Sequence, residues 1–521
     1  MSYIKKYGAF LLICLFYKVS LTAQPAFERH TYEVYHYLYR LAQKGIVEFN
    51  DNVRPISKTY INTVLDSVAA HASRLSDTEK KELAFYLREF REGERKRIMS
   101  AKGDGFTFYA DPVLTASYTG GKGTGVKSTS LGINFWGRIS KNLGYQFSFH
   151  DINESGKGID TSKKSLFAGN TTGIVNHSPF ATNKANYNEL RANLRYEFKK
   201  GAISVGQDYL LWGYGESGRL VLSDKAPVYP YIRLDYQPLP WLKFNYTHAW
   251  LRSNMVDSSR SYPISTGNGY RTVEITKYMA SHSIDITLKK GLIFSLGESI
   301  IYNDRLNIGY LMPIMFFKAV DNNSNSTLLE RGSNGQFFFQ LSSRNQIKNT
   351  HLYGTLFVDE VRLTEIFNRK KQRNQAGYTF GASLTDVGGI NYLTLGAEYT
   401  RIRPFVYRNI LSAQDYVHQG YLMGDWMGSN ADRLVLFTRY TPVPRLKLYA
   451  RYTHLRKGGP GTLDQQYLQE PQPPFLFDFR QKSDEFLLNT SYEYIHRLYL
   501  NMQLRRFDQQ TIYSFGLTYG L

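Results

Sequence analysis

From Gly103 to the C-terminus, apolar and polar residues alternate in segments of strand length, and this pattern constrains the fold more than any other feature. Over residues 131–139 an apolar residue occupies nearly every second position, and the alternation resumes at Tyr145 after a short polar turn. Two further segments, 190–198 and 284–288, alternate in the same way and end in Lys-Lys-Gly turns. Neighbouring side chains of a strand point to opposite faces, so this period of two predicts a series of antiparallel hairpins.

The connections between these segments alternate in length. About eight short turns are expected, near Lys141, Lys199, Gln237, Lys289, Gln346, Val387, Val443 and His496. About nine longer connections are expected between them, near Gly121, Gly156, Gly215, Arg260, Asn322, Arg369, Gln414, Gly461 and Asp508. Bacterial outer-membrane barrels have short periplasmic turns and long outer loops, so the pattern predicts an all-β transmembrane barrel of roughly 18 antiparallel strands over residues 99–521.

Composition favours a wall with one lipid face and one wet face. Aromatic residues make up 15% of the chain, yet its mean hydropathy is −0.39. Outer-membrane barrels combine both properties, because aromatic girdles lie at the membrane interfaces while every second residue is polar. The C-terminal segment is divided in this way, with Tyr513, Phe515 and Leu517 on one face and Ser514 and Gly516 on the other. A large soluble sandwich is the alternative, but its apolar faces would each need a second sheet.

Residues 1–24 have the character of an export signal. Two lysines precede an apolar run at 8–17, and Ala23 provides a small residue at a cleavage point. The single cysteine, Cys14, lies in that run, so the exported chain is expected to contain no disulfide. A lipoprotein anchor at Cys14 is the alternative, which the bulky Ile13 disfavours. No later stretch approaches 18 consecutive apolar residues, so a membrane-inserted form has to be a barrel.

Residues 25–98 are expected to form a small three-helix module in the periplasm. Apolar residues recur at helical spacing from Tyr32 to Ala42, and Gly45 follows as a C-terminal cap. Ser57 is positioned to cap a second helix, and residues 76–79 form a capping box before a third. Because no set of ligand-type residues occurs in it, we expect this module to have a packing role.

The charge of the chain points to an anionic partner. The formal net charge is +20, and most of it falls on residues 99–521. Cations are expensive on a lipid face, so they are expected in the lumen, the turns and the loops. In the predicted outer loops, basic and aromatic residues interleave, and acidic polysaccharides offer carboxylates for Arg and flat sugar faces for Trp and Tyr. The alternative is that these loops bind lipopolysaccharide phosphates or only solvate the rim, and export makes nucleic acid an unsuitable partner.

The stretch from Val205 to Arg233 is the most unusual loop of the barrel segment. Three glycines in close succession after Trp212 describe a backbone that turns sharply while it displays aromatic and cationic groups. We expect an outer connection that contributes to polysaccharide binding, although Trp212 packed against the inner wall is an equal alternative. The candidate ligand-binding residues are Trp212, Tyr214, Arg219, Arg233, Arg401 and Arg403.

No catalytic or metal-binding motif occurs in the sequence. The 11 His do not show metal-ligand spacing, and Ser223 lacks a G-x-S-x-G context. The glycines at 213–218 are not followed by the Lys-Ser/Thr of a phosphate-binding loop. We therefore expect a protein without enzyme activity, cofactor or metal. A hydrolase that assembles Ser, His and Asp from separate strands is the alternative.

Several motifs together resemble the Wzi family of outer-membrane capsule assembly proteins. They are Gly206-Gln207-Asp208, Trp212-Gly213, Gly215 and Leu220–Ser223 in the unusual loop, the Asp359-Glu360 strand end with the preceding Leu352–Val358, and Leu41–Ile46 with Arg54–Ser57 in the helical module. The high Tyr content and the Ala23-Gln24 junction are typical of a Bacteroidetes member of that family.

This resemblance implies an 18-stranded barrel with a periplasmic helical bundle, which acts as a lectin and attaches capsular polysaccharide to the outer surface. It further implies a monomer in contact with outer-membrane lipid and lipopolysaccharide. A pore or a component of secretion or uptake is the alternative function. A lumen filled by the helical module and inward loops would favour the lectin.

Overall fold

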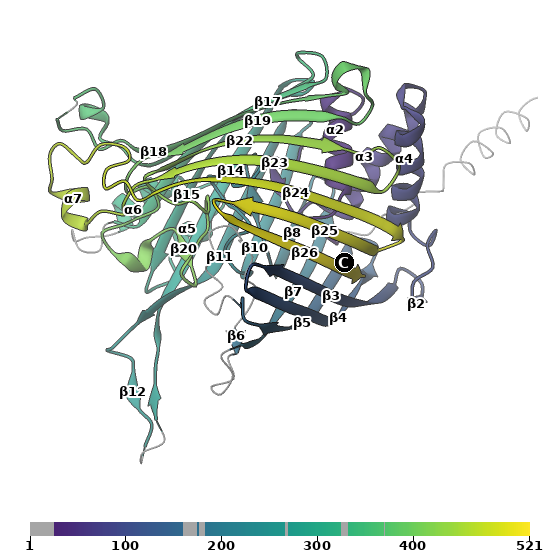
Figure 1. Ribbon diagram of the computed structural model, residues 1–521. Coiled ribbons are helices and arrows are strands. Elements are labelled where there is room, and N and C mark those ends of the chain that lie inside the picture. Colours follow the sequence, from purple (N-terminus) through teal and green to yellow (C-terminus); the bar gives the residue numbers. More distant parts are fainter. Residues whose placement is uncertain are drawn as a thin grey trace, which may run out of the picture.

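The computed structural model describes residues 26–159, 175–176, 183–265, 269–324, 332–368 and 370–520. The expected export signal at 1–24 lies outside these ranges, as does Arg369. The described chain forms a closed antiparallel barrel of 18 strands, with a helical module at one end (Figure 1). Within these ranges, no helix has both the length and the apolar character needed to cross a membrane.

The wall runs in chain order, and its last strand pairs with its first. Tyr519 of the last strand lies opposite Leu114, and this pairing closes the barrel. The wall strands are β3 (Thr107–Gly121), β4 (Thr124–Ser140), β5 (Leu143–Gly156), β7 (Lys184–Phe198), β8 (Gly201–Asp208), β10 (Tyr229–Leu239), β11 (Leu242–Val256), β14 (Glu274–Lys289), β15 (Leu292–Asn303), β16 (Asn334–Arg344), β17 (Thr350–Glu360), β18 (Gln375–Thr385), β19 (Thr394–Ile402), β22 (Ala431–Tyr440), β23 (Leu446–Lys457), β24 (Gln481–Ile495), β25 (Leu498–Phe507) and β26 (Gln510–Tyr519).

The short connections lie where the alternation predicts them. All eight predicted turns join neighbouring wall strands at one end of the barrel, which we call the turn end. The turn expected near Gln237 lies slightly later, between Leu239 and Leu242. At the other end, the loop end, two connections expected to be long are tight instead. Only Lys122-Gly123 and Asp508-Gln509 join their strands, because Gly123 and Asp508 adopt the positive φ that a two-residue turn requires.

Seven long connections remain at the loop end, and several of them contain short helices or strands. These are β6 (Val175–Asn176), β9 (Leu211–Trp212), the hairpin β12 (Tyr262–Pro263) and β13 (Tyr270–Arg271), α5 (Ile308–Leu311), α6 (Phe317–Ser324), the hairpin β20 (Val417–His418) and β21 (Tyr421–Leu422), and α7 (Leu463–Tyr467). In Figure 1, α5, α6 and α7 mark this end, and the β12 hairpin projects away from the wall.

The module at the turn end contains three helices, α2 (Val34–Gln43), α3 (Lys58–Ala70) and α4 (Asp77–Phe90), as predicted. The Ser57 hydroxyl accepts a hydrogen bond from the Tyr60 amide, and Ser76 and Glu79 form the predicted capping box. Strand β1 (Val53–Arg54) lies between α2 and α3, and β2 (Met99–Lys102) leads from the module into the wall by pairing with β3. The module has a core of its own, formed by apolar faces of all three helices.

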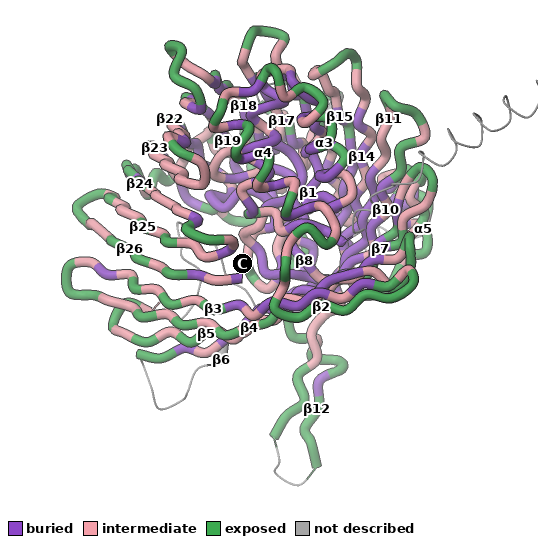
Figure 2. The backbone as a smooth tube through the Cα atoms, turned by 90° about the vertical axis from the view of Figure 1, so that its right-hand side faces the viewer, coloured by how far each residue is buried: buried purple, intermediate pink, exposed green. Residues whose placement is uncertain are grey.

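Hydrogen bonds between buried groups hold the module in the barrel mouth. From α2, Arg40 bonds Asp386 at 2.7 Å, and the Gln43 amide donates to the Ser383 carbonyl at 2.8 Å. From α4, Glu82 accepts a hydrogen bond from the Tyr392 hydroxyl, also in a turn of the wall. The helices are therefore fastened to the turns of the wall, and Figure 2, which views the molecule from that end, shows α3 and α4 within the outline of the barrel.

The two faces of the wall differ as the alternation requires. On β26, Tyr513, Phe515 and Leu517 are exposed on the outer face, whereas Thr518 on the other face is buried. On β10, Tyr231, Arg233 and Asp235 point inward and are buried among polar and aromatic partners. The sequence pattern therefore separates a lipid-facing surface from the lining of the lumen.

Candidate functional site

The long connection after β8 turns into the lumen instead of covering the loop end of the barrel. Its strand β9 pairs with β1 of the N-terminal module, so that Trp212 lies opposite Val53. Gly213 follows with φ +92°, and its amide donates to the Asn52 carbonyl at 2.9 Å. A side chain at this position would be strained and would meet Gln340, which explains the glycine.

A second long connection, residues 403–430, folds inward against the first. The Tyr407 hydroxyl donates to the Leu220 carbonyl at 2.7 Å, and the Tyr416 hydroxyl donates to the Val221 carbonyl at 2.9 Å. In return, the Ser223 hydroxyl donates to the Gly424 carbonyl at 2.6 Å. We call residues 209–228 and 403–430 together the plug. Their apolar side chains pack with inward-facing residues of wall strands from β10 to β23 in the largest buried cluster of the described chain.

A buried ion pair attaches the plug to the wall. Both carboxylate oxygens of Asp425 accept hydrogen bonds from Arg433 of β22, each at 2.9 Å, and both side chains are 0% exposed. Glu398 of β19 lies 3.5 Å from the same guanidinium. A buried cation without such partners would be strongly unfavourable, so the wall and the plug depend on each other here.

The structure brings four of the six candidate residues into the lumen. Trp212 is 1% exposed and packs edge-on against Phe338 of the wall, with ring centres 5.8 Å apart. Tyr214 lies in the same interior, against His351 and Tyr353. Of the two interpretations of Trp212 left open by the sequence, packing against the inner wall is therefore the one that the geometry supports.

Arg233 and Arg219 also contact protein groups. Arg233 donates to Asp235 at 2.8 and 3.0 Å and to the Pro55 carbonyl at 2.9 Å, so it fastens the N-terminal module to β10. Arg219 donates to the carbonyl of Gly213 at 2.9 Å within the plug. Burial lowers the pKa of Arg219, an effect to which the nearby Arg54 adds. Both arginines thus stabilise the filled lumen.

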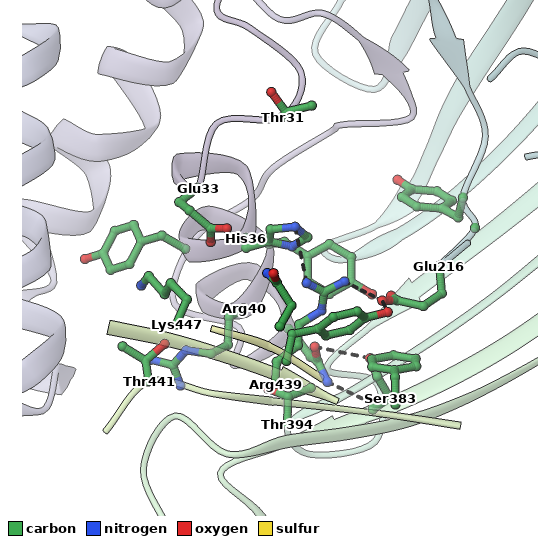
Figure 3. Close-up of a pocket in the computed structure, with 18 of the residues that line it drawn as sticks. Thr31, Glu33, His36, Arg40, Glu216, Ser383, Thr394, Arg439, Thr441 and Lys447 are labelled. Carbon is green, nitrogen blue, oxygen red and sulfur yellow. Dashed lines mark hydrogen bonds and ion pairs between the residues drawn. The ribbon is translucent and has the colours of Figure 1, made fainter. Parts of the chain in front are cut away.

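A polar chamber of about 390 Å³ lies between the plug, α2 and the wall (Figure 3). Arg439 of β22 forms an ion pair with Glu216 of the plug, and the Tyr449 hydroxyl donates to the same carboxylate at 2.7 Å. His36 of α2 lies 3.3 Å from Arg439, and burial together with that cation lowers its pKa well below 6.5. These side chains satisfy one another's hydrogen bonds and charges. The groups that line the chamber therefore form a polar interface between the module, the plug and the wall.

The other two candidates, Arg401 and Arg403, lie at the loop end of the barrel. Arg401 is on the outward face of β19, where its guanidinium stacks over the Phe475 ring at 3.8 Å. Arg403 lines a small polar pocket of about 140 Å³ together with Gln372, Asn374 and Gln472. Three different loops contribute to this pocket, which we call the rim pocket. Within the described part of the chain, neither arginine forms an ion pair.

The nearest carboxylate residue across the wall from these two arginines is already paired. Asp432, the residue opposite Arg401 in the wall, forms its ion pair with Arg456 at 2.5 Å instead. Burial lowers the pKa of Arg403, and the neighbouring Arg401 lowers it further. An uncompensated, half-buried pair of guanidinium groups favours an anion as the missing partner.

Sequence reasoning located the two rim arginines but missed the groups around them. The amides of Gln372 and Gln472 and the ring of Phe475 come from loops far apart in the chain. One signal in the sequence could have indicated this pocket, namely the run Pro471-Gln472-Pro473-Pro474-Phe475. Prolines rigidify a loop and present flat apolar faces. No period in the sequence indicates which loops meet.

The remaining basic residues of the predicted outer loops are largely committed to protein partners. Arg373 donates to the Tyr467 carbonyl, Arg408 donates to the Pro460 carbonyl at 2.6 Å, and Arg362 pairs with Glu470 at 2.9 Å. In the described residues, no group of three or more His, Cys, Asp or Glu side chains is arranged to hold a metal. The geometry of these residues therefore defines a polar, cationic rim at the loop end.

A closed 18-stranded barrel with a lipid-type outer face and loops packed in its lumen defines a plugged β-barrel of the outer-membrane class. Within this class, the chain belongs to the Wzi family of capsule assembly proteins. The sequence profile described as "Capsule assembly protein Wzi" matches residues 125–508, which is most of the chain.

Two solved structures are similar to this chain, and the first of them supports the fold. The Escherichia coli outer-membrane protein Wzi, described as a carbohydrate-binding β-barrel involved in group 1 capsule assembly, has a TM-score of 0.61 to this chain at 12% identity, over 95% of this chain and 99% of its own. Pseudomonas aeruginosa OccK8 (OprE) has a TM-score of 0.44 at 11% identity, over 80% of this chain and 98% of its own. No curated protein matched the sequence.

Proposed function

We propose that this protein holds an acidic polysaccharide at the loop end of the barrel, with Arg401 and Arg403 as the contacts to its carboxylates. The observation that carries the proposal is the half-buried pair of guanidinium groups beside an amide-lined pocket, for which the described part of the chain supplies no counter-ion. Arginine binds carboxylates through paired hydrogen bonds, and amide side chains match the hydroxyl groups of sugars. The proposed role is attachment without catalysis.

Two further findings support this role over transport. The Escherichia coli protein with the same fold is described as carbohydrate-binding, and this chain belongs to the same family of capsule assembly proteins. The plug and the module occupy the lumen between β10 and β23, which disfavours a wide channel. Binding is therefore expected on the loops, and the barrel is expected to serve as their anchor.

The orientation follows from the two ends of the barrel. In outer-membrane barrels the short turns face the periplasm, so we infer that the module of residues 25–98 is periplasmic and that residues 1–24 are removed after export. The exposed apolar outer face is the expected contact for the acyl chains of membrane lipid and of lipopolysaccharide. We infer that the protein is a monomer, because a single chain forms the complete closed wall of the barrel.

The direct test compares the purified wild type with the double variant Arg401→Gln/Arg403→Gln on immobilised polygalacturonate, with uncharged dextran as a reference. Charge-assisted hydrogen bonds contribute about 1.5–3 kcal/mol each, so we expect binding to weaken roughly tenfold or more per arginine. Arg362→Gln/Arg480→Gln is the matched control, because it removes two loop-end cations that already have carboxylate partners.

Three outcomes would contradict the proposal. These are equal losses in both double variants, wild-type binding that does not distinguish polygalacturonate from dextran, and displacement by lipopolysaccharide alone, which would assign the rim arginines to lipid phosphates. In cells, deletion of the gene is expected to release surface polysaccharide into the medium. Unchanged retention on the surface would exclude an attachment role.

A further inference from the structure

A second cationic site lies at the opposite end of the barrel, where α3 stands away from the wall. A groove of about 1080 Å³ separates this helix from three consecutive turns, those that join β7 to β8, β10 to β11 and β14 to β15. Thr63 and Ser67 of α3 and His71, which follows it, line one side of the groove, and Lys199, Lys200 and Lys290 of the turns line the other. We call it the turn-end groove.

The lysines of this groove are not neutralised by the protein. Lys199, Lys200 and Lys290 are exposed, and Lys243, the fourth lysine of the lining, is half-buried. None of the four forms an ion pair among the residues that the structure describes. Lys200 donates to the Pro238 carbonyl at 2.6 Å, which fixes its position without compensating its charge. The deeper arginines of the groove are already paired, as in Arg195 with Asp235 and Arg344 with Asp51. The groove therefore presents a net positive surface, with Glu48 as the one unpaired carboxylate among the described lining residues.

The same turns mark the edge of the membrane. Leu239, Trp241 and Leu288 are exposed at or beside these turns, close to the lysines, and the first two also line the groove. Exposed apolar and aromatic side chains at the end of a barrel strand form the belt that meets the lipid headgroups. Trp241 is 48% exposed and also lines the groove, so the groove reaches the membrane surface sideways.

We propose that the turn-end groove binds the phosphate headgroup of an anionic phospholipid from the adjacent leaflet. The lysines supply the charge, Trp241 lies at the height of the headgroup, and the space beside α3 accommodates the glycerol and its substituents. Basic pockets at the end of a membrane-spanning unit bind anionic headgroups in this way, and each lysine near an anionic surface contributes roughly fivefold in binding. A free acidic polymer in the same compartment is the rival occupant.

The test uses the full-length protein in nanodiscs of phosphatidylcholine with or without phosphatidylglycerol, and native mass spectrometry counts the retained lipid. We expect selective retention of phosphatidylglycerol by the wild type. The variant Lys199→Gln/Lys200→Gln/Lys290→Gln should weaken this retention by about a hundredfold. Replacing the same three lysines by arginine should preserve it, because the charge is kept.

Lys122→Gln/Lys370→Gln/Lys371→Gln is the matched control, since these exposed lysines lie at the loop end. The proposal is overturned if the wild type retains both lipids equally, if the control loses as much lipid as the turn-end variant, or if soluble polygalacturonate displaces phosphatidylglycerol completely. Heat-modifiability of each variant on gels confirms that the barrel is folded, so that a loss of lipid reports on the groove.

Discussion

The ion pair between Asp425 and Arg433 should decide whether the plug stays in the lumen. The change Asp425→Asn removes the charge that Arg433 contacts through two bonds of 2.9 Å, while both side chains have no exposure to water. Removing one partner of a buried pair costs about 3–5 kcal/mol. Glu398 stays 3.5 Å from the guanidinium and compensates part of the loss, so the lower figure, about 3 kcal/mol, applies.

A loss of about 3 kcal/mol raises the population of the undocked plug by roughly a hundredfold. We expect proteolytic cleavage within residues 403–430 and a higher conductance in planar bilayers, whereas the wall keeps its strand pairing and its heat-modifiability. The matched control is Asp484→Asn, because Asp484 also pairs with a neighbouring strand but is 52% exposed, and such pairs contribute only about 0–1 kcal/mol. If the Asp425→Asn variant has the same conductance and the same protease resistance as the control, the ion pair does not hold the plug in the lumen.

Two further perturbations probe the interior. Burial lowers the pKa of His36 well below its ordinary value of 6.5, so His36 stays neutral in the folded protein while it gains a proton in the unfolded chain. Docking of α2 should therefore weaken as the pH falls through 6.5, by at most about 1.4 kcal/mol per pH unit. Hydrogen exchange of the α2 amides measures this dependence, and an equal dependence in His36→Gln would refute it. Trp212→Ala should destabilise plug docking by about 3–5 kcal/mol, whereas Trp212→Phe should retain most of the contact with Phe338. Limited proteolysis compares the two, and equal resistance would show that Trp212 does not support the plug.

The wall could be predicted from the sequence because its signals are local. Alternation with a period of two is visible within each strand, and turns such as Lys199-Lys200-Gly201 show where strands end. The capping box at Ser76 and Glu79 is equally local, and it is confirmed. The prediction of long connections near Gly121 and Asp508 was wrong, although a glycine at position 123 is typical of a tight turn.

The plug could not be predicted, because its partners are distant along the chain. Tyr407 and Leu220 are 187 residues apart, and nothing in either segment indicates that they meet. Glycine and aromatic residues suit an exposed loop and an inward loop equally well, so Trp212 was compatible with both. Arg401 and Arg403 could be recognised in the sequence as basic residues of the predicted outer loops. That neither forms an ion pair with any residue the structure describes is visible only in three dimensions.

The short pairing of β1 with β9 constrains the order in which the molecule can be assembled. Val53 belongs to the segment that precedes the wall, and Trp212 belongs to a connection from the far end of the barrel, yet they lie side by side in the lumen. The seam between β3 and β26 joins the beginning and the end of the wall. Either this seam closes around a segment already inside, or the segment enters afterwards through the turn end. In both routes the lumen is filled as part of biogenesis, so a defect in the N-terminal segment should be detected as a failure of insertion as well as a loss of binding.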